Sequence, residues 1–285
     1  MSVSYYNDIH LKSSGPTIHE HGSHMIMTGV QQNLVERIVS VDTVYRASTN
    51  SDTILISEKI VGVKQMEVDS VDIPFTFYNI TTLNNSFTVV KQSGSTLNLV
   101  LTAGHYSSIN DVISAINTLL SATYGSGAVV FSIDPITKKT HINCTSNYSF
   151  TFTSTNSIAK ILGFRSDLSF GSSFVSDSIA LLHCPRHLYL TINEWSGQNI
   201  NNFSVPTSKG LLNKNIIARI TVPTGLSFGS IINASHSGGL LVSEVRHYAE
   251  KNNILRMEMT LIDENGVKID LNGADFVANL RLLCE

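Results

Sequence analysis

Four histidines near the N-terminus are the first residues whose type and spacing could support chemistry. They are His10, His19, His21 and His24. Imidazole is a common ligand of transition metals, but metal sites usually add carboxylates or thiolates, and only Glu20 lies nearby. Gly and Ser fill much of the surrounding segment. We therefore assign no metal ligand here and expect residues 1–35 to form an extended polar arm.

A thiol and an imidazole also lie close together, at Cys184 and His187. A cysteine nucleophile usually takes its base from a distant part of the sequence, and Pro185 separates these two side chains. We expect both residues to lie at the entry to a strand, without a catalytic role. With Cys144 and Cys284 the chain has three cysteines. An odd number at wide spacing fits free thiols in a reducing compartment better than disulfides or a zinc site.

Carboxylates and glycines supply the remaining candidates for chemistry. Asp263, Glu264 and Asp270 could act as acid and base only in a shared cleft, and their positions instead predict solvated turns and strand faces. The glycines at 225–229 and 238–239 lack the spacing of a phosphate-binding loop, so they predict turns. We therefore assign no catalytic, cofactor-binding or metal-binding residue, and the chain is not expected to be an enzyme.

Composition narrows the class of protein further. Only 14% of the 285 residues are charged, the net charge is −3, and Ser, Thr and Asn are abundant. A basic stripe for nucleic acid is missing, as is an apolar run of the roughly 20 residues that a membrane span requires. The N-terminus does not resemble a secretory signal. Such a surface fits either a glycan-facing β protein or a subunit whose surface is covered by neighbours in an assembly.

The C-terminal residues give the clearest structural pattern. Apolar and polar residues alternate over 257–261, 267–271 and 276–282, and Asp-Glu-Asn-Gly and Asn-Gly separate the three runs. Alternation with a period of two, broken by Asn-Gly, is typical of antiparallel strands with one buried face. This pattern predicts that the chain closes as a β-sandwich.

Most of the remaining chain also predicts short strands. Two segments have helical character: residues 108–122, where Ser108 is the expected N-cap, and residues 156–164, where Gly163 ends the helix. Strands are expected within 35–45, at 54–57, 60–71, 87–90, 97–101, 129–133, 140–144, 150–153, 188–192 and 216–222. These elements predict a mainly β fold, a jelly-roll β-sandwich domain over residues 36–285 with one or two short inserted helices, the main helical insertion lying near 108–122.

Three groups of segments, taken in their order, resemble a known family. They are residues 63–74 with 77–80 and 84–87, then 101–106 with the following helix and 161–164, and finally 261–273. In this order they resemble the penton or minor capsid proteins of the double-jelly-roll DNA virus lineage, which includes virophages, polinton-like viruses and large eukaryotic DNA viruses. The resemblance covers roughly residues 60–285 and leaves out the N-terminal arm.

The resemblance implies a structural virion protein located at the capsid vertex and assembled in the host cell. Members of the family have a jelly-roll fold and form homopentamers that plug the five-fold vertices of an icosahedral capsid. They contact the major capsid protein, which forms double-jelly-roll trimers, and whether other minor capsid proteins also bind is left open. The family has no catalytic residues, so none is transferred to this chain. The arm of residues 1–35 is expected to run under neighbouring subunits as a tie.

Two alternatives remain open at the level of sequence. A minor capsid cement protein has the same features as a penton, and the sequence does not separate them. A receptor-binding or glycan-binding β-sandwich module is the other, because sugars stack on exposed aromatic rings such as those of Tyr189, Trp195 and Phe203.

Overall fold

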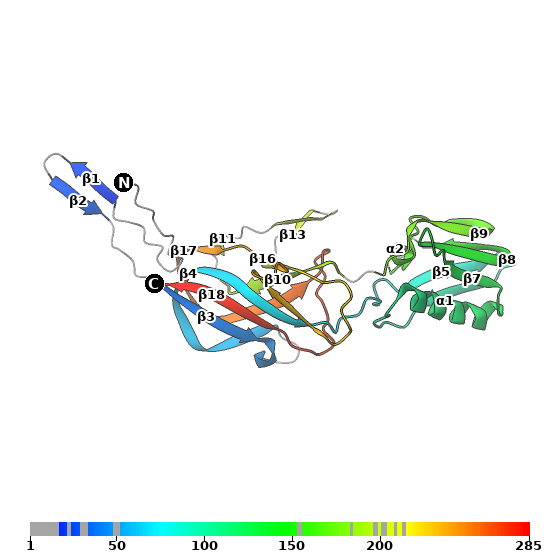
Figure 1. Ribbon diagram of the computed structural model, residues 1–285, viewed down its shortest axis with the longest axis horizontal. Helices are drawn as coiled ribbons and strands as arrows, with labels where there is room; N and C mark the ends of the chain where they lie inside the picture. Colours follow the sequence, from blue (N-terminus) through cyan, green and yellow to red (C-terminus); the bar gives the residue numbers. More distant parts are fainter. Residues whose placement is uncertain are drawn as a thin grey trace. The chain divides into compact units, whose positions relative to one another are not determined.

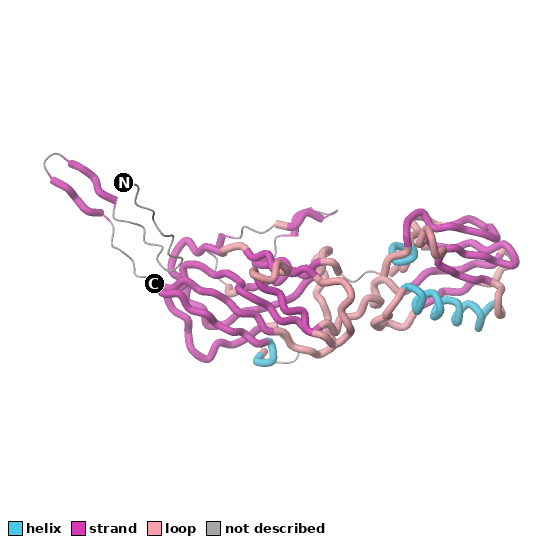
Figure 2. The backbone as a smooth tube through the Cα atoms, in the orientation of Figure 1, coloured by secondary structure: helices cyan, strands magenta, loops and turns pink. Residues whose placement is uncertain are grey.

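The computed structural model is mainly β, as the sequence predicts (Figure 2). It describes residues 17–21, 24–28, 34–47, 52–152, 156–182, 185–195, 199–200, 204–207, 210–212 and 215–285. These residues include two α-helices, and neither is long and apolar enough to cross a bilayer. The chain divides into two compact units, one formed by Met1–Thr76 with Arg186–Glu285 (unit 1) and the other by Phe77–Pro185 (unit 2).

This division differs from the single domain expected over residues 36–285. The helix expected near 108–122 is present, but it belongs to a unit with its own sheet and its own hydrophobic core. The difference arises because the alternation of apolar residues reports which face of a strand is buried, and it does not report which sheet the strand joins.

The described part of the N-terminal segment forms a β-hairpin. Strand β1 (Thr17–His21) pairs with β2 (His24–Thr28) in antiparallel register, with Thr17 opposite Thr28 and His21 opposite His24. This hairpin differs from the extended polar arm that the sequence predicts. Ile18, Ile26 and the Thr residues favour extended backbone, which outweighs the polar composition of the segment.

Unit 1 is built on a nine-stranded antiparallel sheet, coloured mainly blue, cyan, orange and red in Figure 1. Its strand order is β16-β14-β10-β17-β4-β18-β3, with β15 pairing β4 and β11 pairing β17 off this path. The strands are β3 (Val35–Asp42), β4 (Thr53–Pro74), β10 (His187–Asn193), β11 (Asn199–Ile200), β14 (Ile216–Thr221), β15 (Ile231–Ser235), β16 (Leu241–Ser243), β17 (Arg246–Ile262) and β18 (Val277–Cys284). A separate pair joins β12 (Val205–Thr207) to β13 (Gly210–Leu212), and a 3₁₀ turn (Thr43–Tyr45) follows β3.

The long strand β4 allows this sheet to curl. It has 22 residues, pairs with β17, β18 and β15 along its length, and merges the two strands expected at 54–57 and 60–71. The register shifts several times along its pairings with β17 and β18, and such bulges increase local twist. Gly62 has φ +75°, and a Cβ atom there would overlap the carbonyl oxygen of Glu285. The curled antiparallel sheet is a jelly-roll-like β-sandwich, which confirms the predicted fold class.

The core of unit 1 takes side chains two or three residues apart along β4, while β10 and β14 each bury three in succession. On β4 the fully buried side chains are those of Val63, Met66, Val68, Val71 and Ile73. The alternation read at the C-terminus is confirmed, because Met257, Met259, Leu261, Ala278, Leu280 and Leu282 are all buried. Burying an aliphatic side chain of this size contributes about 1.5–3 kcal/mol.

The middle run of that pattern, residues 267–271, was wrongly predicted as a strand. The segment forms only an isolated bridge between Ile262 and Lys268. Local hydrogen bonds explain this, because Oδ1 of Asp263 accepts from the backbone N–H of Val267, and Oδ1 of Asp270 accepts from that of Asn272. Such side-chain acceptors favour turns over a continuous ladder.

Unit 2 packs one helix against a five-stranded antiparallel sheet of order β6-β5-β8-β7, with β9 also pairing β8. Its elements are β5 (Ser86–Lys91), β6 (Thr96–Val100), α1 (Ile109–Tyr124), β7 (Val129–Ile133), β8 (Lys139–Thr151), α2 (Ala159–Leu162) and β9 (Leu168–Ile179). The predicted cap of α1 is confirmed: Oγ of Ser108 accepts from the N–H of Asp111, whose carboxylate accepts from the N–H of Ser108. Gly163, at φ +85°, ends α2 as expected.

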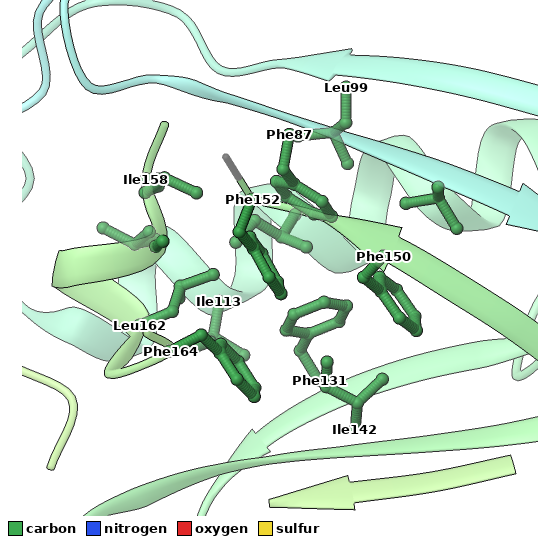
Figure 3. Close-up of a cluster of buried hydrophobic side chains, with 14 of the residues drawn as sticks. Phe87, Leu99, Ile113, Phe131, Ile142, Phe150, Phe152, Ile158, Leu162 and Phe164 are labelled. Carbon is green, nitrogen blue, oxygen red and sulfur yellow. The ribbon is translucent and has the colours of Figure 1, made fainter. Parts of the chain in front are cut away.

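Aromatic rings fill the core of unit 2. Figure 3 shows Phe87, Phe131, Phe150, Phe152 and Phe164 packed among aliphatic side chains from the sheet and both helices. The rings of Phe152 and Phe164 stack with centroids 4.8 Å apart, and Phe131 meets Phe150 edge-on at 5.8 Å. Unit 2 therefore has a core large enough to define a fold by itself.

The other face of the unit 2 sheet has one charged side chain, that of Lys139, at its described, paired positions. The rest of this outer face includes Thr88, Val90, Thr96, Asn98, Val100, Val130, Ser132, His141, Asn143, Ser149, Thr151, Ser173 and Val175. Its side chains are half-buried or exposed, and Thr88 donates a hydrogen bond of 2.8 Å to Asn98 across the strands. The face is thus mainly a surface of hydroxyl, amide and valine side chains, with Lys139 and His141 as its titratable groups.

Candidate functional site

The N-terminal histidines provide no metal site that the structure describes. The backbones of His19, His21 and His24 lie in the β1–β2 hairpin, and His10 lies outside the described residues. Among the described residues, no group of three or more His, Cys, Asp or Glu side chains could hold a metal ion.

The other candidates from the sequence are separated from one another. Cys184 lies outside the described residues, and His187 begins β10. Burial lowers the pKa of His187, and the positive charge of Arg219 lowers it further. Asp263 and Asp270 cap turns, while Glu264 accepts a hydrogen bond from the backbone N–H of Arg186. These carboxylates therefore stabilise loops and do not face a common cleft.

A buried ion pair is the strongest electrostatic feature of unit 1. Nη1 of Arg246 lies 2.7 Å from Oε2 of Glu194, and the two side chains are 2% and 0% exposed. Arg246 also donates to the backbone carbonyls of Ile192 and Asn215, each at 2.7 Å, while its Nε is buried without a described partner. Burial, reinforced by the negative charge of Glu194, raises the pKa of the nearby Tyr248 hydroxyl. The cluster is enclosed, so it cannot meet a large substrate.

An open polar groove lies on the outer face of β10 and β17, the face opposite the buried side chains of Ile192 and Met259. It has a volume of about 340 Å³. It is lined by Thr191 and Asn193 of β10, by Glu258, Thr260 and the buried Ile262 of β17, by Asn215 and Gly266, and by the ion pair between Lys268 and Asp52. We call this set of residues the polar groove.

Cross-strand contacts hold the side chains of the polar groove in place. Oγ1 of Thr191 donates to the carbonyl of Thr260 at 3.2 Å, and Nδ2 of Asn193 donates to Oε2 of Glu258 at 3.2 Å. Nζ of Lys268 lies 2.6 Å and 2.7 Å from the two carboxylate oxygens of Asp52. The groove is therefore preorganised, with carboxylate, amide and hydroxyl groups at fixed positions.

The only tryptophan of the chain, Trp195, lies just beyond the end of β10. Trp195 follows Asn193 by two residues, and its backbone N–H donates to Oδ1 of Asn193 at 3.1 Å. The guanidinium of Arg256 lies 4.3 Å from the centroid of the indole ring, a cation–π contact. Trp195 has φ +54° and remains 45% exposed. Of the other aromatic candidates, Tyr189 is buried and Phe203 lies outside the described residues.

A second hollow, of about 530 Å³, shares Asp52, Thr260 and Lys268 with the polar groove. Arg46 lines it and forms an ion pair with Asp275, whose Oδ1 also accepts from the hydroxyl of Thr43 at 3.0 Å. The charges of Asp52, Lys268, Arg46 and Asp275 are thus each paired within the protein.

Sequence reasoning did not find the polar groove or the buried ion pair. Their residues come from segments that are distant in sequence and meet only because β10 pairs with β17. One local signal was available: Thr191, Asn193 and Trp195 alternate with Ile192 and Glu194. Alternation predicts a shared outer face, but it does not predict the partner strand.

Comparisons with known proteins find similar folds among solved structures. No family model matches the chain, and no curated protein matches it. The fold is similar to that in the crystal structure of the mavirus penton protein, with 14% sequence identity and a TM-score of 0.44. The similar region covers 88% of this chain and 98% of that one. Both the identity and the TM-score are too low for this similarity to assign a function or a site residue.

Proposed function

We propose that this chain is a structural virion protein, a penton subunit that forms a pentamer at the five-fold vertices of an icosahedral capsid and contacts the major capsid protein. The ordered segments that resemble penton and minor capsid proteins support the family, and the jelly-roll-like sandwich of unit 1 agrees with the fold that this resemblance implies.

The observation that carries the proposal is the apolar edge of the unit 1 sheet. Strand β3 is the last strand of that sheet, and it pairs with β18 alone among the described strands. Val35, Ile38, Val44 and Tyr45, on β3 and the turn after it, are between 54% and 73% exposed. An unpaired edge with exposed apolar side chains is a surface that a neighbouring chain can cover.

Charged groups lie next to this apolar edge. Ile38 is directly opposite Arg281 of β18. Arg281 forms ion pairs with Asp69, at 2.5 Å from Nη2, and with Glu36, at 3.4 Å from Nε. An apolar centre with a polar rim is the usual anatomy of a protein interface. In a closed ring, each subunit presents two different faces to its neighbours, so β3 would supply one of the two.

Light scattering over a concentration series tests the proposal. We expect the mass to rise by mass action toward five times 31.1 kDa. Ile38→Glu should shift this rise to at least about tenfold higher concentration, because it places a charge in the contact. Ile136→Glu is the matched control, since Ile136 is 88% exposed on a turn of unit 2 and should not matter. A dimer or trimer contradicts the pentamer, and a monomer at every concentration favours a cement protein.

The arm has a separate test. Under this proposal it ties neighbouring subunits together, so deleting residues 1–33, which leaves β3 intact, should preserve the free energy of unfolding and reduce incorporation into particles. If the truncated chain is incorporated as well as the full chain, the arm has no such role.

A further inference from the structure

We infer that the polar groove on the outer face of β10 and β17 binds a neutral saccharide. The inference does not depend on the capsid role, because the groove is a property of unit 1 alone. The apolar edge of β3 does not use it, and the buried ion pair meets it only at the backbone carbonyl of Asn215.

The polar groove contains hydrogen-bonding groups that no described residue occupies. Oε2 of Glu258 is held by Asn193, while Oε1 has no partner among the described residues. The side-chain amide of Asn215 and the hydroxyl of Thr260 likewise make no hydrogen bond with a described residue. Carboxylate and amide oxygens accept, amide N–H groups donate, and hydroxyls do both. Adjacent sugar hydroxyls, which also donate and accept, are the chemical complement of this set.

Charge selects a neutral ligand over an acidic or basic one. Lys268 and Asp52 neutralise each other through a close ion pair. Glu258 carries one negative charge, and Arg256, two residues away on the same face of β17, carries one positive charge. The residues around the groove therefore sum to no net charge. A phosphate or a polyanion would find no excess of cations here.

The indole of Trp195 provides the apolar part of the site. Arg256 covers one face of the ring, and the residue remains 45% exposed, so part of the indole is open to a ligand. The backbone holds the residue at φ +54° with the help of Asn193, a strained conformation of the kind found at binding sites. Pyranose rings present flat C–H surfaces that pack against aromatic rings. A groove of about 340 Å³ lies within the size range of small-ligand sites.

Trp195 makes the test direct, because it is the only tryptophan of the chain. The full-length protein is titrated with methyl glycosides of glucose, galactose, mannose, fucose and N-acetylglucosamine and with disaccharides of these sugars, while tryptophan emission is recorded. We expect a saturable change with at least one of them at millimolar concentration. Ligand-observed NMR saturation transfer on the same samples verifies binding independently of fluorescence.

Variants locate the binding. Glu258→Gln and Asn215→Ala should each weaken it at least tenfold, with unchanged circular dichroism. Asn233→Ala is the matched control, because Asn233 donates to Asp72 at 2.7 Å in a similar amide–carboxylate pair elsewhere in unit 1. That variant should bind as the parent does. Trp195→Phe should retain part of the saturation-transfer signal, since an aromatic ring is preserved.

Three results would overturn the inference. The first is that no sugar in the panel gives a saturable signal by either method. The second is that binding occurs but is indifferent to both Glu258→Gln and Asn215→Ala, which would place it elsewhere on the chain. The third is that sialic acid or sulfated sugars bind while neutral sugars do not, which would contradict the charge argument.

Discussion

Arg246 and Glu194 form an ion pair of 2.7 Å that is almost completely shielded from solvent. Arg246 lies at the start of β17, Glu194 directly follows β10, and the backbone carbonyl that accepts from Nη2 of Arg246 belongs to Asn215, just before β14. The pair therefore ties together the ends of three neighbouring strands beneath the polar groove.

Removing one partner of this pair should destabilise unit 1 strongly. Arg246→Met leaves the Glu194 carboxylate buried without its cation, so we expect a loss of about 3–5 kcal/mol in the free energy of unfolding, measured with urea. Replacing both residues, as Arg246→Met with Glu194→Leu, should cost less than Arg246→Met alone, because no uncompensated charge remains. Arg186→Ala, which removes a largely exposed ion pair with Glu264, should cost about 1 kcal/mol or less. Equal losses for the buried and exposed pairs would contradict this picture.

Gly163 should tolerate a side chain much less well than Gly94. Both have positive φ, of +85° and +107°, so alanine strains the backbone at either position. A Cβ at position 163 would also overlap the carbonyl oxygen of Ser178, whereas at position 94 it would meet nothing within 4 Å. We expect Gly163→Ala to lower the free energy of unfolding by about 2 kcal/mol or more, and Gly94→Ala by about 1 kcal/mol. Calorimetry that ranks the two variants in the opposite order would show that β9 adapts.

Truncating Phe150 should loosen unit 2 and leave unit 1 unchanged. Its ring contacts those of Phe131 and Phe174, with centroids 5.8 Å and 5.5 Å away. Phe150→Ala should cost about 3–5 kcal/mol, because the cavity adds to the lost burial. Hydrogen exchange should rise in peptides from residues 77–185 and stay constant in those from unit 1. The control Ile136→Ala alters an exposed side chain and should change neither the stability nor the exchange. Faster exchange throughout the chain in Phe150→Ala would mean that the two units unfold together.

The described thiols should react slowly in the native protein. Burial raises the pKa of Cys144 to about 11, and it also raises that of Cys284. At pH 8 the thiolate fraction of Cys144 is then on the order of 0.1%, since each pKa unit above the pH removes about tenfold. In a Cys184→Ser background, a chromogenic disulfide reagent should react with both thiols rapidly only after denaturation. The unfolded state loses the Cys144 proton near pH 9, whereas the folded state keeps it until about pH 11. The free energy of unfolding therefore falls as the pH rises from about 9 through 11.

Local patterns predicted most of the fold, and non-local pairing accounts for the errors. The Ser108 cap and the alternation through Met257, Met259 and Leu261 depend on residues that are near in sequence, so both were read correctly. Strand β9 was missed because Ser176 is its only fully buried residue, which leaves no apolar alternation to detect. The division into two units was missed for a related reason, since hydrophobic alternation does not assign a strand to a sheet.

The candidate site was less accessible to sequence analysis than the fold. The histidines, the cysteines and the turn carboxylates attract attention because their types are associated with chemistry. The polar groove instead depends on Thr, Asn and Glu side chains, which are common throughout this chain. Their significance lies in the pairing of Asn193 with Glu258 and of Thr191 with Thr260, a register that only the folded sheet defines.

The insertion of unit 2 within unit 1 has a consequence for the order in which the chain folds. Strands β4 and β15 pair directly, Ile73 opposite Ile232, although the whole of Phe77–Pro185 lies between them in sequence. Closing so long a flexible loop has an entropic cost that grows with loop length. A folded unit 2 shortens the effective loop, because its contacts are local and its chain has already lost its freedom. Unit 2 should therefore form first, and the rate at which β4 meets β15 should depend on it.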